Sequence, residues 1–333
     1  MMFITPVTLN AINLEFTDYC NAACPMCSRF KWDGSLYKEK VNQNHNTLEM
    51  LQKRIPEKII KQLKQFRSVG TYGDPIMNPE CLKICKWVRG LNPDCRIELH
   101  SNGGARNETF WQELARTGIS IRFNIDGLQD TNHLYRRKVV WKKLMQNVKA
   151  FIGAGGDASW GFIVFKHNEH QIEDARALSK EMGFGWFGEY YSDRWKSSDW
   201  ITGETMDVDK WPVDDYYLEK PTSQENKFYD KSTVGVYEEE QFDLDKKVVC
   251  KMASNKKYEV YIRANGDVQP CCMLGDLDVH EAKVLIKDPK SVNINHTDLV
   301  DILDGEFFKL LDQGINQGSE DRLKNCFYTC GVK

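Results

Sequence analysis

The chain has 333 residues, and its 45 basic and 48 acidic residues nearly cancel to a formal charge of −3. This balance gives no electrostatic footprint for a nucleic-acid partner. No apolar run approaches the roughly 20 residues of a membrane-spanning helix, and the first residues lack an export signal. We therefore expect a cytoplasmic protein with no membrane partner, long enough for one large domain and a smaller attachment.

The eleven cysteines are an odd number and most of them are clustered. Without an export signal, this pattern argues against a disulfide framework and indicates metal ligation.

Up to about residue 191 the chain alternates short β-branched or aromatic runs with longer stretches of helical period, which is typical of repeated βα units. The expected strands are 11–16, 68–73, 96–100, 119–125, 159–165 and 184–190. Six such units predict an α/β fold built on a partial (β/α)6 TIM barrel, and we assign this core to residues 1–196.

Polar residues follow several of these strands directly. In parallel barrels the loops at the carboxyl ends of the strands build the active site. We therefore expect one rim to hold Cys20 to Cys27, Gly73, Asp74, Ser101, Asn102 and Asp126.

Residues 197–247 lose the helical period and are rich in aromatic and acidic side chains, as in a linker or lid. In residues 248–333, the runs 258–262 and 268–270 flank a turn and predict a β-hairpin. An amphipathic helix is expected at 298–311, so this part should be a small α+β domain.

Cys20, Cys24 and Cys27 lie within eight residues, directly after the first expected strand. Thiolates are the ligands that iron-sulfur clusters require, and three of them leave one iron of a cubane open. The alternative is a zinc knot or incidental thiols, but zinc usually has a fourth ligand nearby and none follows.

This C-x3-C-x2-C loop resembles the signature of the radical SAM superfamily. The resemblance implies a [4Fe-4S] cluster on Cys20, Cys24 and Cys27, whose open iron binds the amino and carboxylate groups of S-adenosylmethionine (SAM). It also implies reductive release of a 5′-deoxyadenosyl radical, and hence an electron donor such as flavodoxin or ferredoxin.

Three later segments resemble the SAM-binding segments of that family. Gly73 and Asp74 match its G-G-E-P segment, with Asp in place of Glu, near the SAM amino group. Ser101 and Asn102 match its T-N-G segment near the methionyl moiety, and Asn124 takes the place of the serine of S-I-D-G at the ribose. Each segment is also an ordinary turn sequence, so their common order carries the resemblance.

Three further positions complete the match. Met26 stands where the family usually has an aromatic residue near the adenine. Arg136 or Arg137 corresponds to the basic residue that meets the SAM carboxylate, although either can simply begin a helix. Asn168 corresponds to a position near the ribose or adenine.

A second cysteine set resembles the opening and terminal cysteines of SPASM and twitch domains, which hold auxiliary clusters. The resemblance implies one auxiliary [4Fe-4S] cluster on Cys250, Cys271, Cys326 and Cys330. Three further cysteines of a full SPASM pattern are missing, which favours the shorter twitch form. Cys272 is an alternative to Cys271, and zinc is an alternative occupant. Cys81, Cys85 and Cys95 receive no role.

These features together predict a radical SAM enzyme that abstracts a hydrogen atom from its substrate. A peptide or protein substrate is favoured because the aromatic, acidic segment 197–247 can cover an extended chain at the barrel mouth. A small-molecule or nucleotide substrate is the alternative within the class. The alternative from another class is a non-catalytic iron-sulfur electron carrier or redox sensor.

Overall fold

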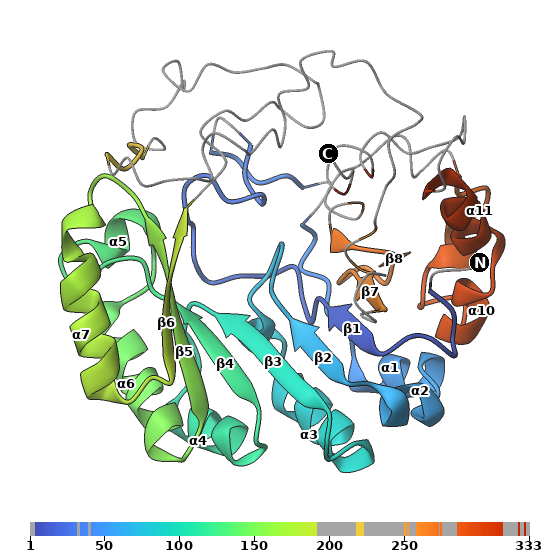
Figure 1. Ribbon diagram of the computed structural model, residues 1–333, viewed down its shortest axis with the longest axis horizontal. Helices are drawn as coiled ribbons and strands as arrows, with labels where there is room; N and C mark the ends of the chain where they lie inside the picture. Colours follow the sequence, from blue (N-terminus) through green and yellow to red (C-terminus); the bar gives the residue numbers. More distant parts are fainter. Residues whose placement is uncertain are drawn as a thin grey trace.

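The computed structural model describes residues 4–31, 34–38, 41–191, 218–222, 250, 252, 258–272, 274, 285–315, 326 and 330. Its centre is one eight-stranded sheet in the order β6-β5-β4-β3-β2-β1-β7-β8. The strands are β1 (Ala11–Leu14), β2 (Gln65–Ser68), β3 (Arg96–Ser101), β4 (Ser120–Asn124), β5 (Asp157–Val164), β6 (Trp186–Tyr191), β7 (Glu259–Ile262) and β8 (Val268–Gln269). All neighbouring pairs are parallel except the β7–β8 hairpin, and the sheet is curved but does not close (Figure 1).

Helices cover the convex face of this sheet (Figure 1). The α-helices are α1 (Leu48–Arg54), α2 (Glu57–Gln62), α3 (Cys81–Leu91), α4 (Glu108–Arg116), α5 (Asn132–Tyr135), α6 (Trp141–Gly153), α7 (Ile172–Met182), α10 (Leu299–Leu303) and α11 (Glu306–Ile315). Short 3-10 helices are η1 (Pro75–Met77), η2 (Glu169–Gln171) and η6 (Pro289–Val292). The predicted partial (β/α)6 barrel with a small C-terminal α+β part is confirmed. Among the described residues, no helix has the length and apolar character to cross a bilayer.

The core lies between the sheet and these helices. Trp111 of α4, Phe123 of β4 and Phe151 of α6 are fully buried. The Phe123 ring centroid lies 5.2 Å from that of Trp111 and 5.7 Å from that of Phe151. Apolar residues on alternate strand positions thus face the helices, which leaves the other strand face and the carboxyl ends of the strands free for polar side chains.

The second strand lies earlier than predicted. It covers Gln65–Ser68, with Phe66 and Ser68 buried, and it pairs with the start of β3 from Arg96. The expected strand 68–73 was wrong because the chain turns at Gly70, where φ is +66° and an added Cβ would lie 2.3 Å from the Gly73 carbonyl oxygen. The loop after β2 therefore begins sooner and reaches the barrel rim.

The C-terminal part adds to the barrel sheet directly. The predicted hairpin forms β7 and β8, and β7 pairs in parallel with β1 from Ala11↔Glu259 to Leu14↔Ile262. The expected helix 298–311 is instead two helices, α10 and α11, because the chain breaks at Asp304 and Gly305. The boundary predicted at residue 248 stays a prediction.

Candidate functional site

A pocket opens at the carboxyl ends of the first four strands. It is lined by nine of the residues predicted to bind a cluster or SAM: Cys20, Cys24, Cys27, Gly73, Asp74, Ser101, Asn102, Asn124 and Arg136. These residues are spread over more than a hundred positions of the chain, and the strands bring them together. Their predicted roles in binding stay predictions, but their common location supports them.

The cysteine loop presents its thiols to this pocket. Cys24 is buried, while Cys20 and Cys27 are partly exposed. The Cys20 sulfur accepts hydrogen bonds from the Ala22 N–H at 3.4 Å and from Asn102 Nδ2 at 3.6 Å. Arg136 Nη1 donates to the Cys24 sulfur at 3.7 Å. N–H donors aimed at sulfur stabilise thiolate character and tune iron-sulfur sites.

Burial sets the protonation of these thiols. It raises the pKa of Cys20 to about 12, helped by the nearby Asp74 carboxylate, and the pKa of Cys24 to about 11 against the effect of Arg136. Both groups are therefore neutral thiols at pH 7, and a metal must displace their protons when it binds.

The donor set fits an iron-sulfur cluster. Three soft sulfur ligands share one pocket wall, and hydrogen-bond donors reach two of them. Within the described residues, no three His, Cys, Asp or Glu side chains converge as they would on a single ion. A cubane makes a different demand, because each iron takes its own thiolate.

Asp74 joins the ends of β2 and β3. Its carboxylate accepts from the Ser101 hydroxyl at 3.1 Å and from the Asn102 N–H at 2.8 Å, and it caps η1 through the Ile76 N–H. Burial raises the pKa of Asp74 to about 6, and these hydrogen bonds oppose the rise. The carboxylate thus orders the rim, and its predicted contact with an ammonium group stays a prediction.

Gly73 permits the closest backbone approach at the rim. A Cβ built at Gly73 would lie 2.0 Å from the Thr17 carbonyl oxygen, so only glycine fits beside the loop after β1. The glycine therefore holds the β2 loop against the start of the cysteine loop.

Asn102 connects β3 to the cysteine loop. Besides Cys20, its Nδ2 donates to Asn21 Oδ1 at 2.9 Å, and its Oδ1 accepts from the Gly104 N–H at 2.8 Å. The side chain is 3% exposed. Its hydrogen bonds therefore fix the loop that carries the first thiol.

Arg136 enters the pocket and Arg137 does not. Arg136 Nε donates to Asp126 Oδ2 at 2.5 Å, and the buried Asp126 also accepts from the Ile163 N–H at 2.5 Å. Burial raises the pKa of Asp126, while the Arg136 guanidinium lowers it. The Arg137 side chain instead donates to the Leu134 carbonyl at 3.4 Å. Of the two alternatives, Arg136 is the one placed to meet an anionic ligand group.

Met26 and Asn168 lie outside the pocket lining. Met26 is 7% exposed, belongs to the hydrophobic core and has a left-handed φ of 59°. Asn168 is fully buried; it donates to the Asp126 and Ile163 carbonyls and accepts from the Phe165 N–H at 2.7 Å. Their predicted SAM contacts stay predictions, and the structure gives Asn168 a role in holding the ends of β4 and β5.

Sequence reasoning missed two residues of the cysteine loop. Asn21 exchanges hydrogen bonds with Asn102, and the buried Arg29 donates to the Ala22 carbonyl at 3.2 Å. Arg29 also lowers the pKa of Cys20, although burial outweighs this effect. The sequence held one clue to both residues, because each lies close to a predicted cysteine ligand.

The second cysteine set lies only partly within the described residues. Cys250, Cys271, Cys272, Cys326 and Cys330 are each partly buried. Cys271 accepts from the Leu274 N–H at 3.4 Å. Most residues between these cysteines lie outside the described part, so the choice between Cys271 and Cys272 stays a prediction. Cys81, Cys85 and Cys95 are buried and do not line the cysteine pocket.

Most of the predicted linker or lid also lies outside the described residues. Its residues 218–222 are described, and they contact the loop after β5. The Lys166 N–H donates to the Glu219 carbonyl at 3.0 Å, and the Thr222 N–H donates to Glu169 at 2.6 Å. At least this short piece therefore packs at the barrel rim.

The fold and the pocket define a class of iron-sulfur protein in which a partial α/β barrel carries three thiols at its rim. A family profile described as the radical SAM superfamily matches residues 14–178, and the SPASM profile, described as an iron-sulfur cluster-binding domain, matches residues 250–331. The chain belongs to the radical SAM superfamily and carries a SPASM domain. These domains imply a [4Fe-4S] cluster with SAM, and auxiliary iron-sulfur binding.

Several solved structures have a similar fold. Streptococcus suis SuiB bound to the precursor peptide SuiA is 13% identical with a TM-score of 0.57, over 94% of this chain and 71% of that one. The anSMEcpe protein with bound AdoMet is 14% identical with a TM-score of 0.56, over 97% of this chain and 86% of that one. The chain spans 65% of SuiB in its complex with SAM. At this identity the likeness shows the fold alone, and no curated protein matches the chain significantly.

Proposed function

We propose that the protein is an enzyme that cleaves SAM reductively and abstracts a hydrogen atom from a peptide or protein substrate. The observation that carries the proposal is the convergence of three thiols and six residues predicted to bind SAM on one barrel-rim pocket. Cys20, Cys24 and Cys27 would hold the [4Fe-4S] cluster, which supplies the electron for cleavage of the sulfonium when it is bound.

The residues of this chain position and shield the cofactor. Arg136 offers a guanidinium to the SAM carboxylate, while Asp126 fixes its orientation. Ser101, Asn102 and Asn124 line the same pocket and offer hydrogen bonds to the rest of SAM. Tyr72, Ser101 and Asn102 are buried in the pocket wall and would shield a bound cofactor from solvent.

A peptide substrate is supported by the solved structures of similar fold. SuiB was solved with the precursor peptide SuiA, and anSMEcpe with AdoMet and the Cp18Cys peptide. The aromatic and acidic segment 197–247 adds side chains that suit an extended chain. We propose flavodoxin or ferredoxin as the electron donor and the cytoplasm as the location, where thiols stay reduced.

A small polar molecule is the second candidate substrate, and the polar face of β3 and β4 favours it. Glu98 accepts from His100 Nε2 at 3.0 Å and lies 3.9 Å from Arg122. The hydrogen bond from His100 lowers the pKa of Glu98 to about 2, so this carboxylate is charged at pH 7. The positively and negatively charged side chains on this face of β3 and β4 suit a small zwitterionic molecule as well as a peptide.

The C-terminal cysteines are proposed to hold one auxiliary [4Fe-4S] cluster. Cys250, Cys271, Cys326 and Cys330 supply four thiolates, which complete the coordination of a cubane. The SPASM match over this part of the chain supports the assignment.

Anaerobic reconstitution tests the proposal. We expect about eight irons in the wild type and about four in the Cys20→Ala, Cys24→Ala, Cys27→Ala variant. The wild type should form 5′-deoxyadenosine with dithionite, and the triple variant should not. Cys95→Ala, at a buried cysteine outside the site, is the matched control and should keep both properties. Zinc in place of iron, or intact SAM with the wild type, would contradict the proposal.

A further inference from the structure

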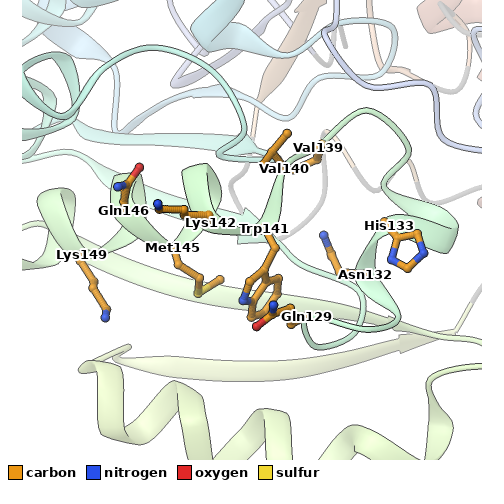
Figure 2. A pocket seen from close by; sticks show the side chains of 10 residues that line it. All are labelled: Gln129, Asn132, His133, Val139, Val140, Trp141, Lys142, Met145, Gln146 and Lys149. Carbon is orange, nitrogen blue, oxygen red and sulfur yellow. The ribbon is translucent and has the colours of Figure 1, made fainter.

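A second, larger concavity lies beside α5 and α6 and is separate from the cysteine pocket. This α5–α6 groove has a volume of about 770 Å³, and Figure 2 shows the side chains that line it. Val139, Val140, Trp141 and Met145 supply its apolar surface. Val140 is 64% exposed, so this part of the apolar surface faces solvent.

The rim of the groove is basic. Between Asp130 and Asp157 the chain has no acidic residue but six cations, of which Lys142 and Lys149 line the groove, while Arg136 lines the cysteine pocket and pairs with Asp126. Lys142 and Lys149 line the groove and are exposed. Neither forms an ion pair with any residue in the described part of the chain. The whole chain has nearly zero net charge, but this stretch is locally positive, which favours an acidic partner.

Asn132 adds an unused hydrogen-bond donor. Its side chain is 1% exposed and lines the groove beside His133, as Figure 2 shows. Its Oδ1 accepts from the Asp126 N–H at 2.9 Å, but its Nδ2 has no hydrogen-bond partner among the described residues. This donor is therefore an unsatisfied polar atom buried in the wall of the groove.

The groove is next to the cysteine loop through one short segment, residues 136–139. On one side of that segment, the Arg137 carbonyl accepts from the Ala23 N–H at 3.0 Å, and Arg136 reaches the Cys24 sulfur at 3.7 Å. On the other side, Val139 lines the groove. A tight turn at Lys138, whose φ is +67°, connects the two sides. A protein seated in the groove would therefore lie one chain layer away from the thiols.

We propose that the α5–α6 groove is the docking site of an acidic electron-transfer protein of the flavodoxin type. This rests on the proposed function, because reductive cleavage needs one electron for each event. The electron leaves the reduced flavin of the partner and enters the site held by the cysteine loop, and no bond forms between the two proteins. The acidic surface of the partner would face Lys142 and Lys149.

Binding measured by calorimetry tests the docking site without relying on catalysis. The probe is an oxidised, acidic flavodoxin, titrated into wild type, a Lys142→Glu, Lys149→Glu variant and a Lys58→Glu, Lys64→Glu control. The control lysines are exposed, unpaired within the described residues, and lie near α2 on the other side of the barrel (Figure 1). Unchanged thermal unfolding would verify that all three proteins are folded.

We expect the Lys142, Lys149 variant to bind at least tenfold more weakly, the control to bind as the wild type does, and wild-type affinity to fall with added salt. Flavodoxin-driven SAM cleavage should fall in parallel, while dithionite-driven cleavage should not change. If the Lys142, Lys149 variant and the control bound flavodoxin with equal affinity, the docking site would be contradicted. It would also be contradicted if the Lys142, Lys149 variant lost affinity for a peptide substrate but still bound flavodoxin. If the wild type failed to cleave SAM with dithionite, the proposed function would be contradicted. The binding measurement would still test the docking site, because it does not depend on cleavage.

Discussion

At the scale of single residues, Gly73 is the position where the rim tolerates least change. A Cβ there would meet the Thr17 carbonyl at 2.0 Å, whereas a Cβ at Gly90 of α3 would meet nothing within 4 Å. We expect Gly73→Ala to destabilise the protein by about 2 kcal/mol or more, because backbone must move. Gly90→Ala should stabilise it by about 0.5–1 kcal/mol through helix propensity. Urea unfolding of the two variants measures both, and equal effects would contradict the packing described at the rim.

A second residue-scale prediction concerns pH. His167 stacks on Phe165 at 5.3 Å, and burial, followed by His133 and His170, lowers its pKa from 6.5 to about 4. The unfolded chain therefore takes up this proton first, and stability contributed by neutral His167 is lost as the pH falls from about 6.5 to 4. The loss is on the order of 1 kcal/mol, because the ring is partly exposed to solvent.

His167→Gln should flatten the pH dependence of the unfolding free energy in that window. Urea unfolding at several pH values between 4 and 7 measures the slope. An unchanged slope in His167→Gln would show that the imidazole is not held neutral.

At the scale of elements, β7 is the link between the C-terminal part and the barrel. Val260, Tyr261 and Ile262 are fully buried beside β1, and Glu259 pairs with Arg67 of β2. Each fully buried apolar side chain contributes about 1.5–3 kcal/mol, against a usual total stability of about 5–15 kcal/mol. Loss of this strand would also leave β1 as an exposed edge.

A chain ending at residue 247 should therefore melt at least about 10 °C lower than the full chain and associate in solution. Thermal unfolding and size-exclusion chromatography measure these effects. A monomer that melts within about 2 °C of the full chain would instead favour an autonomous core over residues 1–196.

Local pattern explains which elements could be predicted from the sequence. The alternating pattern of β4 and the cysteine spacing after β1 are local features, so this strand and the three-thiol loop were found. The shift of β2 was missed because its start is set by pairing with β3 and by the turn at Gly70. The pairing of β7 with β1 joins segments about 250 residues apart and leaves no local pattern.

The candidate site was predictable where a residue directly follows a strand. Asp74 and Asn102 were found in this way, although their hydrogen bonds to the rim and to Cys20 required the structure. Spacing alone could not choose between Arg136 and Arg137, because the choice depends on the turn that presents only Arg136 to Asp126. It also could not show that the partners of Asn168 are backbone groups.

At the scale of the whole molecule, the barrel places two surfaces on opposite sides of the segment 136–139. One surface is the pocket of thiols and polar side chains, and the other is the basic α5–α6 groove. The proposed functions of the two are distinct, since the pocket can hold SAM whether or not a partner occupies the groove. Both proposed functions depend on the cysteine loop, because its three thiols must leave one iron of the cluster open to SAM.

Electron paramagnetic resonance of the anaerobically reduced protein, recorded with and without SAM, tests that dependence most directly. We predict a [4Fe-4S]+ signal whose shape changes on addition of SAM, and loss of the SAM-dependent part in the Cys20→Ala, Cys24→Ala, Cys27→Ala variant. A wild-type spectrum that is identical with and without SAM would contradict the account.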